Sequence, residues 1–369
     1  MIPWSRPDFH GKEEKYLRQA LKSTWISDGE FIRSFEYKFS KFLKTKSKSI
    51  TVSNCTTAIH LIYLTLGLKH GDEIILPGFG YMAAANIALQ MGLKPIFADV
   101  DLDTFCVSYK SLKKKISKKT KLIVLIHTYG NICDMKPICN LAKEKKIPIL
   151  EDCAESFGSK YNAKESGTFG QFATFSFQAT KTITTGEGGM IVTKKNNSFV
   201  KKLKSIKSHG VLKERYFHVY PGHNFRLTNL QAAVGCAQLN KFSEIKKERQ
   251  RIYLQYKKLF KNIEGIKLQK FHKNVNPLVW TFAVVVDDKK FPQRDKLIKI
   301  LKKKGIETRN GFYSPCRLPL YKKFKTDHLI NSKFLSKNII CLPFFTSLKN
   351  DQINFIFKEF IKLRKTRAH

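Results

Sequence analysis

The first 250 residues alternate short apolar runs with helical segments, and this alternation limits the chain to a small set of folds. Short apolar runs between helical segments are typical of strands joined by crossover helices, which build a mostly parallel sheet. We predict seven strands, at residues 49–52, 73–77, 94–98, 121–126, 147–151, 173–177 and 189–193. The fold class predicted from this pattern is α/β.

The rest of the chain predicts a smaller second region. A charged helix at residues 241–260 leads into a strand at 281–286, followed by helices at 294–304 and 351–364. No low-complexity linker separates the two regions, so we expect them to pack together. The predicted organisation is a large domain at 1–250 and a small α+β domain at 251–369.

Positive charge is the strongest compositional signal. The chain has 68 Lys and Arg residues against 29 Asp and Glu residues, a formal net charge of +39. Such a balance favours anionic partners, including nucleic acid. The lysines are nevertheless spread in short runs, and in residues 111–121 Leu112 and Ile116 recur at the spacing of a solvated helix. The sequence also has no recognised DNA-reading module. We favour a generally basic surface and keep a nucleic-acid-binding regulator as the alternative from another class.

Several other classes are disfavoured by simple counts. The eight cysteines are scattered without a CxxC pair or a Cys/His spacing typical of zinc, so we expect reduced thiols and no metal. No apolar run approaches the roughly 18 residues of a membrane span, and the first residues lack the apolar stretch of a signal peptide. We therefore expect a cytoplasmic protein.

One lysine stands out in the stretch FSFQATKTITTGEGGM at residues 175–190. Lys181 follows a predicted strand and precedes Gly186, Gly188 and Gly189, which permit a sharp turn of the backbone. Upstream, IPILEDCAESFG places Asp152 at the carboxyl end of another strand, where open α/β sheets bind ligands. Taken alone, a lysine beside such a glycine turn is usually solvated, and the aspartate is equally a functional residue or a helix cap.

A third element is a candidate anion site. In VSNCTTAIHL a strand runs into a helix, so the backbone N–H groups of Thr56 and Thr57 are expected at a helix N-terminus that attracts phosphate. Tyr81, in ILPGFGYMAAAN, is either a ring that stacks on a ligand or a packing residue. A pyridoxal phosphate site needs a partly desolvated lysine, a carboxylate and phosphate donors. The sequence offers candidates for all three.

These motifs, in this order, resemble the pyridoxal-phosphate-dependent sugar-nucleotide aminotransferases of the DegT/DnrJ type. The resemblance runs from IPWSRPDFHGKEEKYLRQALKSTWIS to NIICLPFF, through SNCTTAIHL, ADVDLDTF, EDCAESFG, GHNFRLTNLQAAVGCAQL and GIETRNGFY. It implies an aspartate-aminotransferase-like fold of type I, with a large seven-stranded domain and a small C-terminal domain.

The resemblance also implies roles for individual residues. Lys181 would carry the cofactor as a Schiff base and move the proton during transfer, while Asp152 would pair with the pyridine nitrogen and Tyr81 would stack on the ring. Glu155 falls near the ring oxygen, where many relatives have Gln or His. The implied phosphate ligands are Thr56, Thr57, Ser176 and, from the neighbouring subunit of a homodimer, Asn224.

The substrate follows from the resemblance with less detail. The family transfers nitrogen from an amino acid, most commonly L-glutamate, to a nucleotide-linked keto sugar. The IPWSRPDFHG, TWIS and EDCAE segments are most similar to the perosamine synthase branch, which aminates C4 of a GDP-linked 4-keto-6-deoxy sugar. UDP- and dTDP-linked 3- or 4-keto sugars remain alternatives, whereas a related sugar dehydratase is disfavoured because it lacks the lysine. The implied sugar-facing residues are Trp25, Arg309, Phe312 and Tyr313.

Two departures from the family pattern concern the site. Cys55 stands where relatives commonly have glycine before the phosphate-binding threonine, so the turn must accommodate a side chain. Cys316 lies in a loop, GFYSPCRLPLY, where some relatives carry histidine. This second difference leaves the sugar contacts of that loop open.

Overall fold

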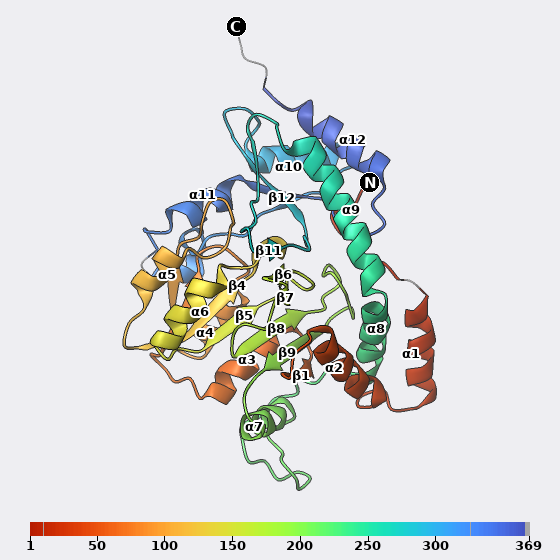
Figure 1. The fold of residues 1–369 in the computed structure, drawn as a ribbon, viewed down its shortest axis with the longest axis vertical. Coiled ribbons are helices and arrows are strands. Elements are labelled where there is room, and N and C mark those ends of the chain that lie inside the picture. Colours follow the sequence, from red (N-terminus) through yellow and green to blue (C-terminus); the bar gives the residue numbers. More distant parts are fainter. Residues whose placement is uncertain (10, 325, 366–369) are drawn as a thin grey trace.

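A large twisted sheet forms the centre of the computed structural model, which describes residues 1–9, 11–324 and 326–365 (Figure 1). The sheet has seven strands in the order β1-β9-β8-β5-β4-β2-β3. Their bounds are β1 Lys48–Val52, β2 Glu73–Pro77, β3 Lys94–Ala98, β4 Thr120–Ile126, β5 Ile149–Asp152, β8 Phe172–Ser176 and β9 Gly189–Thr193. All seven predicted strands are present, with ends displaced by at most two residues.

In this sheet, strands β3, β2, β4, β5 and β8 run parallel to one another. Only β9 runs antiparallel to its neighbours β1 and β8. Parallel neighbours need crossover connections, which the intervening helices supply. These are α3 Cys55–Leu66, α4 Ala83–Gln90, α5 Tyr109–Lys115 and α6 Met135–Glu144. The prediction of an α/β fold with a mostly parallel seven-stranded sheet is therefore confirmed.

Helices cover both faces of this sheet because its side chains alternate between two apolar cores. Ile74, Leu122 and Val124 face the core shared with α3, α4 and α7 (Asn197–Lys207). Ile75, Ile123 and Leu125 face α5 and α6. At the β8–β9 end this second face is covered by α2 Glu30–Phe42 and α8 Asn229–Asn240, and α1 Lys12–Lys22 lies beside α8.

A second, smaller sheet follows in the later part of the chain, in the order β10-β12-β14-β13. Around its core pack α9 Phe242–Phe260, α10 Arg294–Lys303 and α12 Asn350–Ile361, while α11 Ile330–Asn338 packs on β12. The strands are β10 Ile266–Leu268, β12 Phe282–Val286, β13 Arg309–Asn310 and β14 Ile339–Leu342. The strand and helices predicted in this region are present. The domain division at residue 250 stays a prediction, since α9 runs through that position (Figure 1).

A third sheet of β6 Lys160–Tyr161, β7 Lys164–Glu165 and β11 Val275–Asn276 ties the two parts together, because β11 from the later region pairs with β6. The lysine-rich segment is partly as predicted. Leu112 is buried on α5, but the helix ends at Lys115 and Ile116 follows it in an extended conformation. Within the described residues, we find no helix with the length and apolar character needed to span a bilayer.

Candidate active site

The candidate site lies where β4, β5 and β8 reach their carboxyl ends side by side. Asp152 is the last residue of β5, Ser176 is the last of β8, and His127 directly follows β4. The backbone N–H of His127 donates to the Asp152 carbonyl at 3.1 Å. Because the strands are parallel, their polar terminal residues meet at one edge of the sheet, which is the usual ligand position in such folds.

Lys181 is held inward at this edge. Its side chain is 15% exposed, and Nζ lies 3.7 Å from Glu155 Oε1. On another side, Nζ is 3.9 Å from the ring centroid of Trp280, a cation–π contact. The indole N–H of Trp280 donates to the Thr180 carbonyl at 2.8 Å, which fixes the turn just before the lysine. Lys181 is therefore a positioned, largely desolvated amine and not a solvated lysine.

The glycines behind Lys181 act in two different ways. Gly186 has φ +82° with open space around it, so it supplies the left-handed turn that was expected. Gly189 instead permits a close approach: a Cβ there would lie 2.6 Å from the carbonyl carbon of Asn54 and 2.8 Å from the amide nitrogen of Cys55. The start of β9 thus presses against the start of α3. The expectation that all three glycines serve the turn by their backbone angles holds for Gly186.

Asp152 is a buried carboxylate with an open oxygen. Oδ1 accepts from Ala154 N at 3.1 Å and from the Cys55 thiol at 3.9 Å, whereas Oδ2 has no hydrogen bond from a described residue. Burial raises the pKa of Asp152, while the hydrogen bond from the Ala154 N–H and the charge of Lys181 act against that rise. A cationic hydrogen-bond donor would stabilise the ionised form of such a buried carboxylate. The Cys55 side chain packs on this acid.

Glu155 is the second buried acid of the site. Oε2 accepts from the backbone N–H of Tyr129 at 3.0 Å, and Oε1 faces Lys181. Burial raises its pKa to about 7, although the Lys181 charge and the Tyr129 hydrogen bond both lower it. Glu155 therefore titrates near neutral pH.

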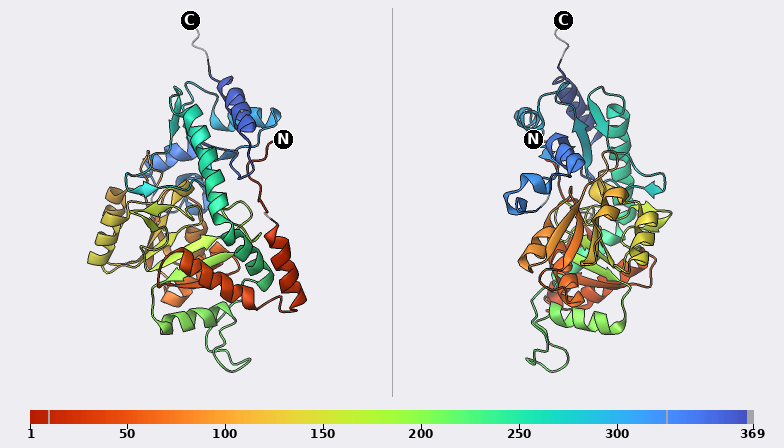
Figure 2. Two further views of the ribbon diagram at one scale, coloured as in Figure 1. Left: turned by 45° about the vertical axis from the view of Figure 1, so that its right-hand side comes forward. Right: turned by 90° about the vertical axis from the view of Figure 1, so that its left-hand side faces the viewer.

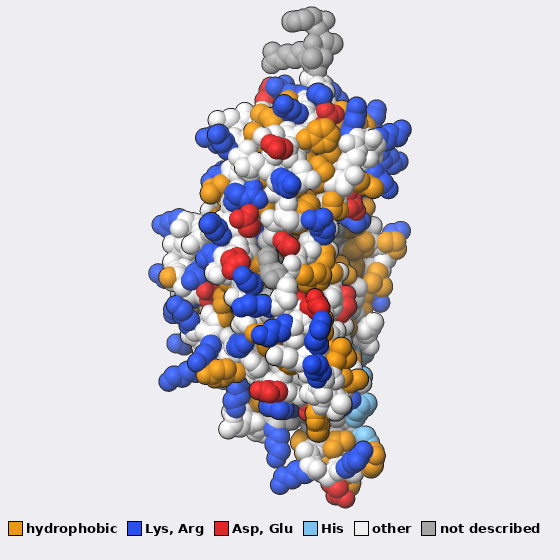
Figure 3. Space-filling view, turned by 90° about the vertical axis from the view of Figure 1, so that its right-hand side faces the viewer, with side chains coloured by type: hydrophobic (Ala, Val, Ile, Leu, Met, Phe, Trp, Pro, Cys, Tyr) orange, Lys and Arg blue, Asp and Glu red, His pale blue; other side chains and the backbone are white. Residues whose placement is uncertain are grey.

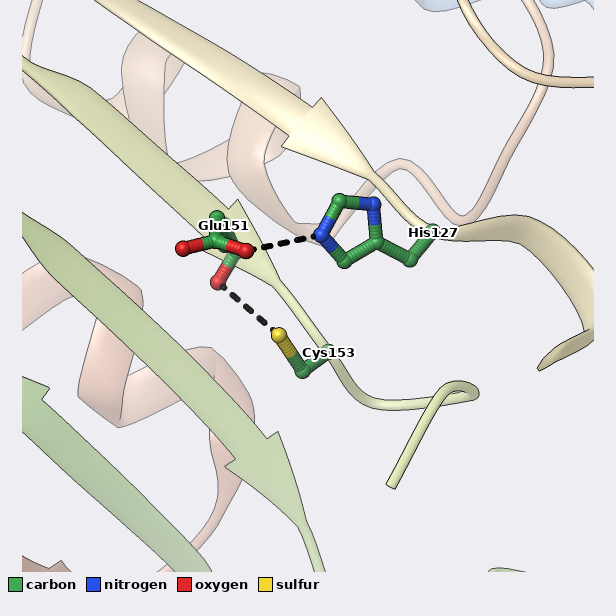
Figure 4. A group of neighbouring side chains, drawn as sticks. All are labelled: His127, Glu151 and Cys153. Atoms are coloured by element: carbon green, nitrogen blue, oxygen red, sulfur yellow. Dashed lines mark hydrogen bonds and ion pairs between the residues drawn. The ribbon is translucent and has the colours of Figure 1, made fainter. Parts of the chain in front are cut away.

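A neighbouring cluster of His127, Glu151 and Cys153 has the spacing of a metal site but is satisfied by hydrogen bonds (Figure 4). Glu151 accepts from His127 Nε2 at 3.0 Å and from three backbone N–H groups in residues 167–170, at 2.7 to 3.0 Å. His127 Nδ1 accepts from Cys133 N at 3.3 Å, so the neutral ring donates through Nε2. These bonds occupy the carboxylate, and we interpret the cluster as a support for the end of β5.

The N-terminus of α3 supplies an anion site close to Asp152. The amides of Cys55 and Thr56 have no partner among the described residues, and Thr56 is exposed. Thr57 differs from expectation. Its N–H donates to Asn54 Oδ1 at 2.8 Å and its hydroxyl is engaged with the Asn54 backbone, a capping box. Free amides are therefore available from Cys55 and Thr56, while Thr57 shapes the helix end.

The ring and sugar residues predicted near the lysine lie around an aromatic wall. Phe312 stacks on Tyr129 at 5.3 Å and contacts Tyr81 edge-on at 6.2 Å. Tyr81 is 65% exposed and Tyr313 is 40% exposed. Arg309 lies over the ring of Trp4 at 5.9 Å and pairs with Glu307 at 2.7 Å. The structure thus places Arg309, Phe312 and Tyr313 in the same region as Tyr81. Their contacts with a ligand stay predictions.

Asn224 and Trp25 lie apart from this cluster. Asn224 is exposed in the connection between α7 and α8, which extends beyond the body of the molecule (Figure 2). It pairs with Ser208 in an isolated bridge, and Arg226 donates to the Ser208 hydroxyl at 2.8 Å. Trp25 is 68% exposed between α1 and α2, and its carbonyl accepts from Asn229 Nδ2 at 2.7 Å. Among the described residues, neither Asn224 nor Trp25 is in contact with Lys181.

Comparison with known proteins agrees with this geometry. Residues 7–360 match the model of the DegT/DnrJ/EryC1/StrS aminotransferase family. The chain belongs to this family. It is 40% identical over 357 residues to the GDP-perosamine synthase of Escherichia coli O157:H7, with 96% of each chain covered. It is 38% identical to the GDP-perosamine synthase of Vibrio cholerae, covering 96% of this chain and 97% of that one.

Among solved structures, the PLP form of the putative sugar aminotransferase Spr1654 from Streptococcus pneumoniae superimposes with a TM-score of 0.93 at 26% identity. The match covers 98% of each chain. The predictions of an enzyme of this aminotransferase family and of a type I fold are confirmed.

Three further residues of this aminotransferase site were missed by sequence reasoning. Trp280 backs Lys181, Tyr129 holds Glu155 through its N–H, and Trp4 contacts Trp280 edge-on at 5.6 Å. They come from three distant segments. The one available signal was the position of Trp280, directly before the predicted strand at 281–286.

Proposed function

We propose that this aminotransferase moves an amino group from L-glutamate to C4 of a GDP-linked 4-keto-6-deoxy sugar. The observation that carries the proposal is Lys181, a desolvated amine held between Glu155 and Trp280 beside the buried carboxylate of Asp152. Identity of 36–40% to three GDP-perosamine synthases supports the choice of sugar. Amination of a UDP- or dTDP-linked keto sugar is the second candidate, since the framework described serves either.

The cofactor is pyridoxal 5'-phosphate, and the residues present fit it. The open Oδ2 of Asp152 suits a protonated pyridine nitrogen, and the free amides of Cys55 and Thr56 suit a phosphate. The Thr174 hydroxyl is buried and lies within reach of the Cys55 thiol.

When bound, the cofactor supplies an electron sink that stabilises negative charge on the substrate carbon. The protein holds the components of this chemistry in place. Asp152 keeps a proton on its partner nitrogen because a buried carboxylate favours a cationic donor. Lys181 Nζ accepts and returns the proton at the reacting carbon, and general acid–base catalysis of this kind contributes about 10²- to 10⁴-fold. Trp280 limits the freedom of Nζ and excludes water from one side.

We further propose that the enzyme is a homodimer in which Asn224 of the partner subunit completes the phosphate site. The support is exposed apolar surface: Trp25, Tyr81, Tyr216 and Phe217 are between 61% and 75% exposed. Exposed aromatic side chains of this kind are typical of interaction surfaces. We also place the reaction in the cytoplasm, because all eight cysteines are free thiols, as a reducing compartment favours.

The test of the cofactor is optical. The purified protein is expected to show visible absorbance that borohydride changes irreversibly, and Lys181→Ala is expected to fold but to lose that reducible absorbance. Lys160→Ala is the matched control. Lys160 lies away from the site, and its Nζ is 3.1 Å from Oε1 of Glu165. A Lys181→Ala protein with wild-type turnover would contradict the assignment of the amine.

The test of the substrate uses product mass. Glutamate-dependent amination is measured on GDP-, UDP- and dTDP-linked 4-keto-6-deoxy sugars, and a mass change on the GDP sugar alone is expected. Preference for a UDP- or dTDP-linked sugar would replace the first candidate with the second.

A further inference from the structure

We propose that Glu155 is the proton acceptor for Lys181. In this scheme Glu155 is ionised while Nζ is a free ammonium and becomes protonated when Nζ condenses with an aldehyde. The inference rests on the proposed function, since it needs the aldehyde of the cofactor to reach Lys181. It goes beyond the placement of Glu155 near a ring oxygen, because it assigns the carboxyl a proton that moves with the covalent state of the lysine.

Geometry places the acceptor beside the donor. Glu155 Oε1 lies 3.7 Å from Nζ, and the carboxyl is 4% exposed while the lysine side chain is 15% exposed. Oε2 is fixed by the Tyr129 N–H at 3.0 Å, so the free oxygen is the one that faces the lysine. A proton that leaves Nζ therefore has a buried acceptor nearer than bulk water.

The other titratable groups that face Glu155 are few. Asp152 acts on it as a like charge, and the Tyr129 phenol and the thiols of Cys55 and Cys341 lie within its electrostatic reach. Burial keeps the phenol and both thiols neutral, because it raises the pKa of each. Among the described residues, the cation that contacts Glu155 is Lys181, at 3.7 Å.

Charge balance makes the proton transfer follow from the condensation. While Nζ is an ammonium, it offsets one buried carboxylate. When Nζ becomes part of a neutral carbon–nitrogen double bond, Glu155 loses this counter-charge. A buried carboxylate without a cation is costly, so the carboxyl takes a proton instead.

The atoms balance without any further reactant. The ammonium and the aldehyde form a carbon–nitrogen double bond and one water molecule, whose oxygen comes from the aldehyde and whose two hydrogens come from Nζ. The third ammonium proton goes to Glu155 Oε1. No electrons are exchanged with another group.

The test counts protons released to solvent when the apoenzyme binds pyridoxal phosphate, by calorimetry in buffers of different ionisation enthalpy. At pH 8 we expect Glu155→Gln to release about one more proton per site than wild type. At pH 5.5 the two proteins should release equal numbers, because Glu155 is already protonated there, its pKa being about 7. Glu165→Gln is the matched control: Glu165 is also buried but pairs with Lys160, and wild-type counts are expected.

Each outcome has one meaning. Equal proton release by wild type and Glu155→Gln at pH 8, with both binding the cofactor, would overturn the role of Glu155 and leave the proposed function intact. Failure of wild type itself to bind the cofactor would overturn the proposed function.

A second measurement uses the apoenzyme alone. Because the Glu155 carboxylate lies 3.7 Å from Nζ and attracts the ammonium, acylation of Lys181 at pH 7.5 should be severalfold faster in Glu155→Gln than in wild type. An unchanged rate, read by peptide mass, would also contradict the proposal.

Discussion

Two acids three residues apart, Asp152 and Glu155, show how one site tunes similar groups differently. Both are buried and both have a raised pKa. Asp152 has an open oxygen and a thiol contact, and so it suits a permanent cationic donor. Glu155 faces an amine whose charge changes during the reaction. Burial therefore has different consequences at the two positions: Asp152 keeps a fixed charge beside a cationic partner, whereas Glu155 can gain or lose a proton.

The first residue-scale prediction concerns Asp152 and the pH dependence of apoenzyme stability. A raised folded-state pKa means that the carboxyl favours folding when protonated, and this contribution is lost as pH rises through that pKa. Asp152→Asn removes the penalty, so its melting temperature should gain on wild type as pH increases from 4 to 8. Its turnover should nevertheless fall at least about 100-fold, since the amide does not stabilise a cationic partner.

Asp103→Asn is the control, because its stability relative to wild type is expected to change with pH in the opposite direction. Lys267 and Lys270 lower the pKa of Asp103 below its ordinary value of 3.8, so this variant should lose stability relative to wild type as pH rises from about 2 to about 5. Parallel pH profiles for the two variants would contradict both assignments.

The second residue-scale prediction concerns Glu151, whose carboxylate accepts three backbone N–H groups and His127 (Figure 4). Glutamine offers one acceptor oxygen and turns an N–H toward one of these donors. Glu151→Gln should lower the free energy of unfolding by about 3 kcal/mol. Urea unfolding measures the loss, and a change under about 1 kcal/mol would show that the network contributes little.

At the scale of elements, the site depends on the contact between β9 and α3. Gly189→Ala should push the start of β9 away from the Asn54–Cys55 peptide and weaken pyridoxal phosphate binding about tenfold or more. The measurement is a titration of the apoenzyme followed by absorbance. Gly67→Ala is the control at the other end of α3: its φ of +70° costs about 1 kcal/mol of stability, but open space surrounds it. Equal affinity for pyridoxal phosphate in Gly189→Ala and Gly67→Ala would contradict the role assigned to the contact between β9 and α3.

The order of the elements could be predicted from the sequence because a parallel sheet has a strong local signal. Each strand is an apolar run of limited length, and each crossover helix has its own period, so seven strands emerge without knowledge of their neighbours. The positions of Lys181 and Asp152 at the sheet edge follow from the same pattern.

The contacts that tune the site could not be predicted in this way. Trp280 and Tyr129 reach Lys181 and Glu155 through folding of distant segments, which leaves no local periodicity. The engagement of the Thr57 N–H could not be predicted for a different reason: a threonine at this position serves equally as a cap or as a ligand, and here its N–H donates to Asn54 Oδ1. Burial sets the pKa of Glu155 near 7, and the burial of one residue is a property of the whole fold.

At the scale of the whole molecule, the formal net charge is +39, and the basic residues occur in short runs along the whole chain. On the face that carries α1, α8 and α9, Lys and Arg side chains are distributed from end to end and interleaved with acids and apolar groups (Figure 3). A DNA-binding surface would concentrate them on one stripe or helix. The distribution favours attraction of anionic small substrates over a defined nucleic-acid site.

The shared site of the proposed homodimer gives the last prediction. Lys181→Ala removes the amine, and Asn224→Ala removes the residue that would be contributed by the partner subunit. Each variant alone should have little activity. In a mixed dimer, however, one site combines Lys181 from one chain with Asn224 from the other, while the second site carries both substitutions. Random exchange should therefore restore about a quarter of wild-type turnover.

The order of mixing supplies the control. Refolding the two variants together should restore activity, whereas mixing them after separate refolding should restore less, at a rate set by subunit exchange. If co-refolded variants stay inactive although mass measurement detects mixed dimers, Asn224 serves the site of its own chain. If only monomers are found, the exposed aromatic residues around Trp25 and Tyr216 must serve a partner other than a second copy.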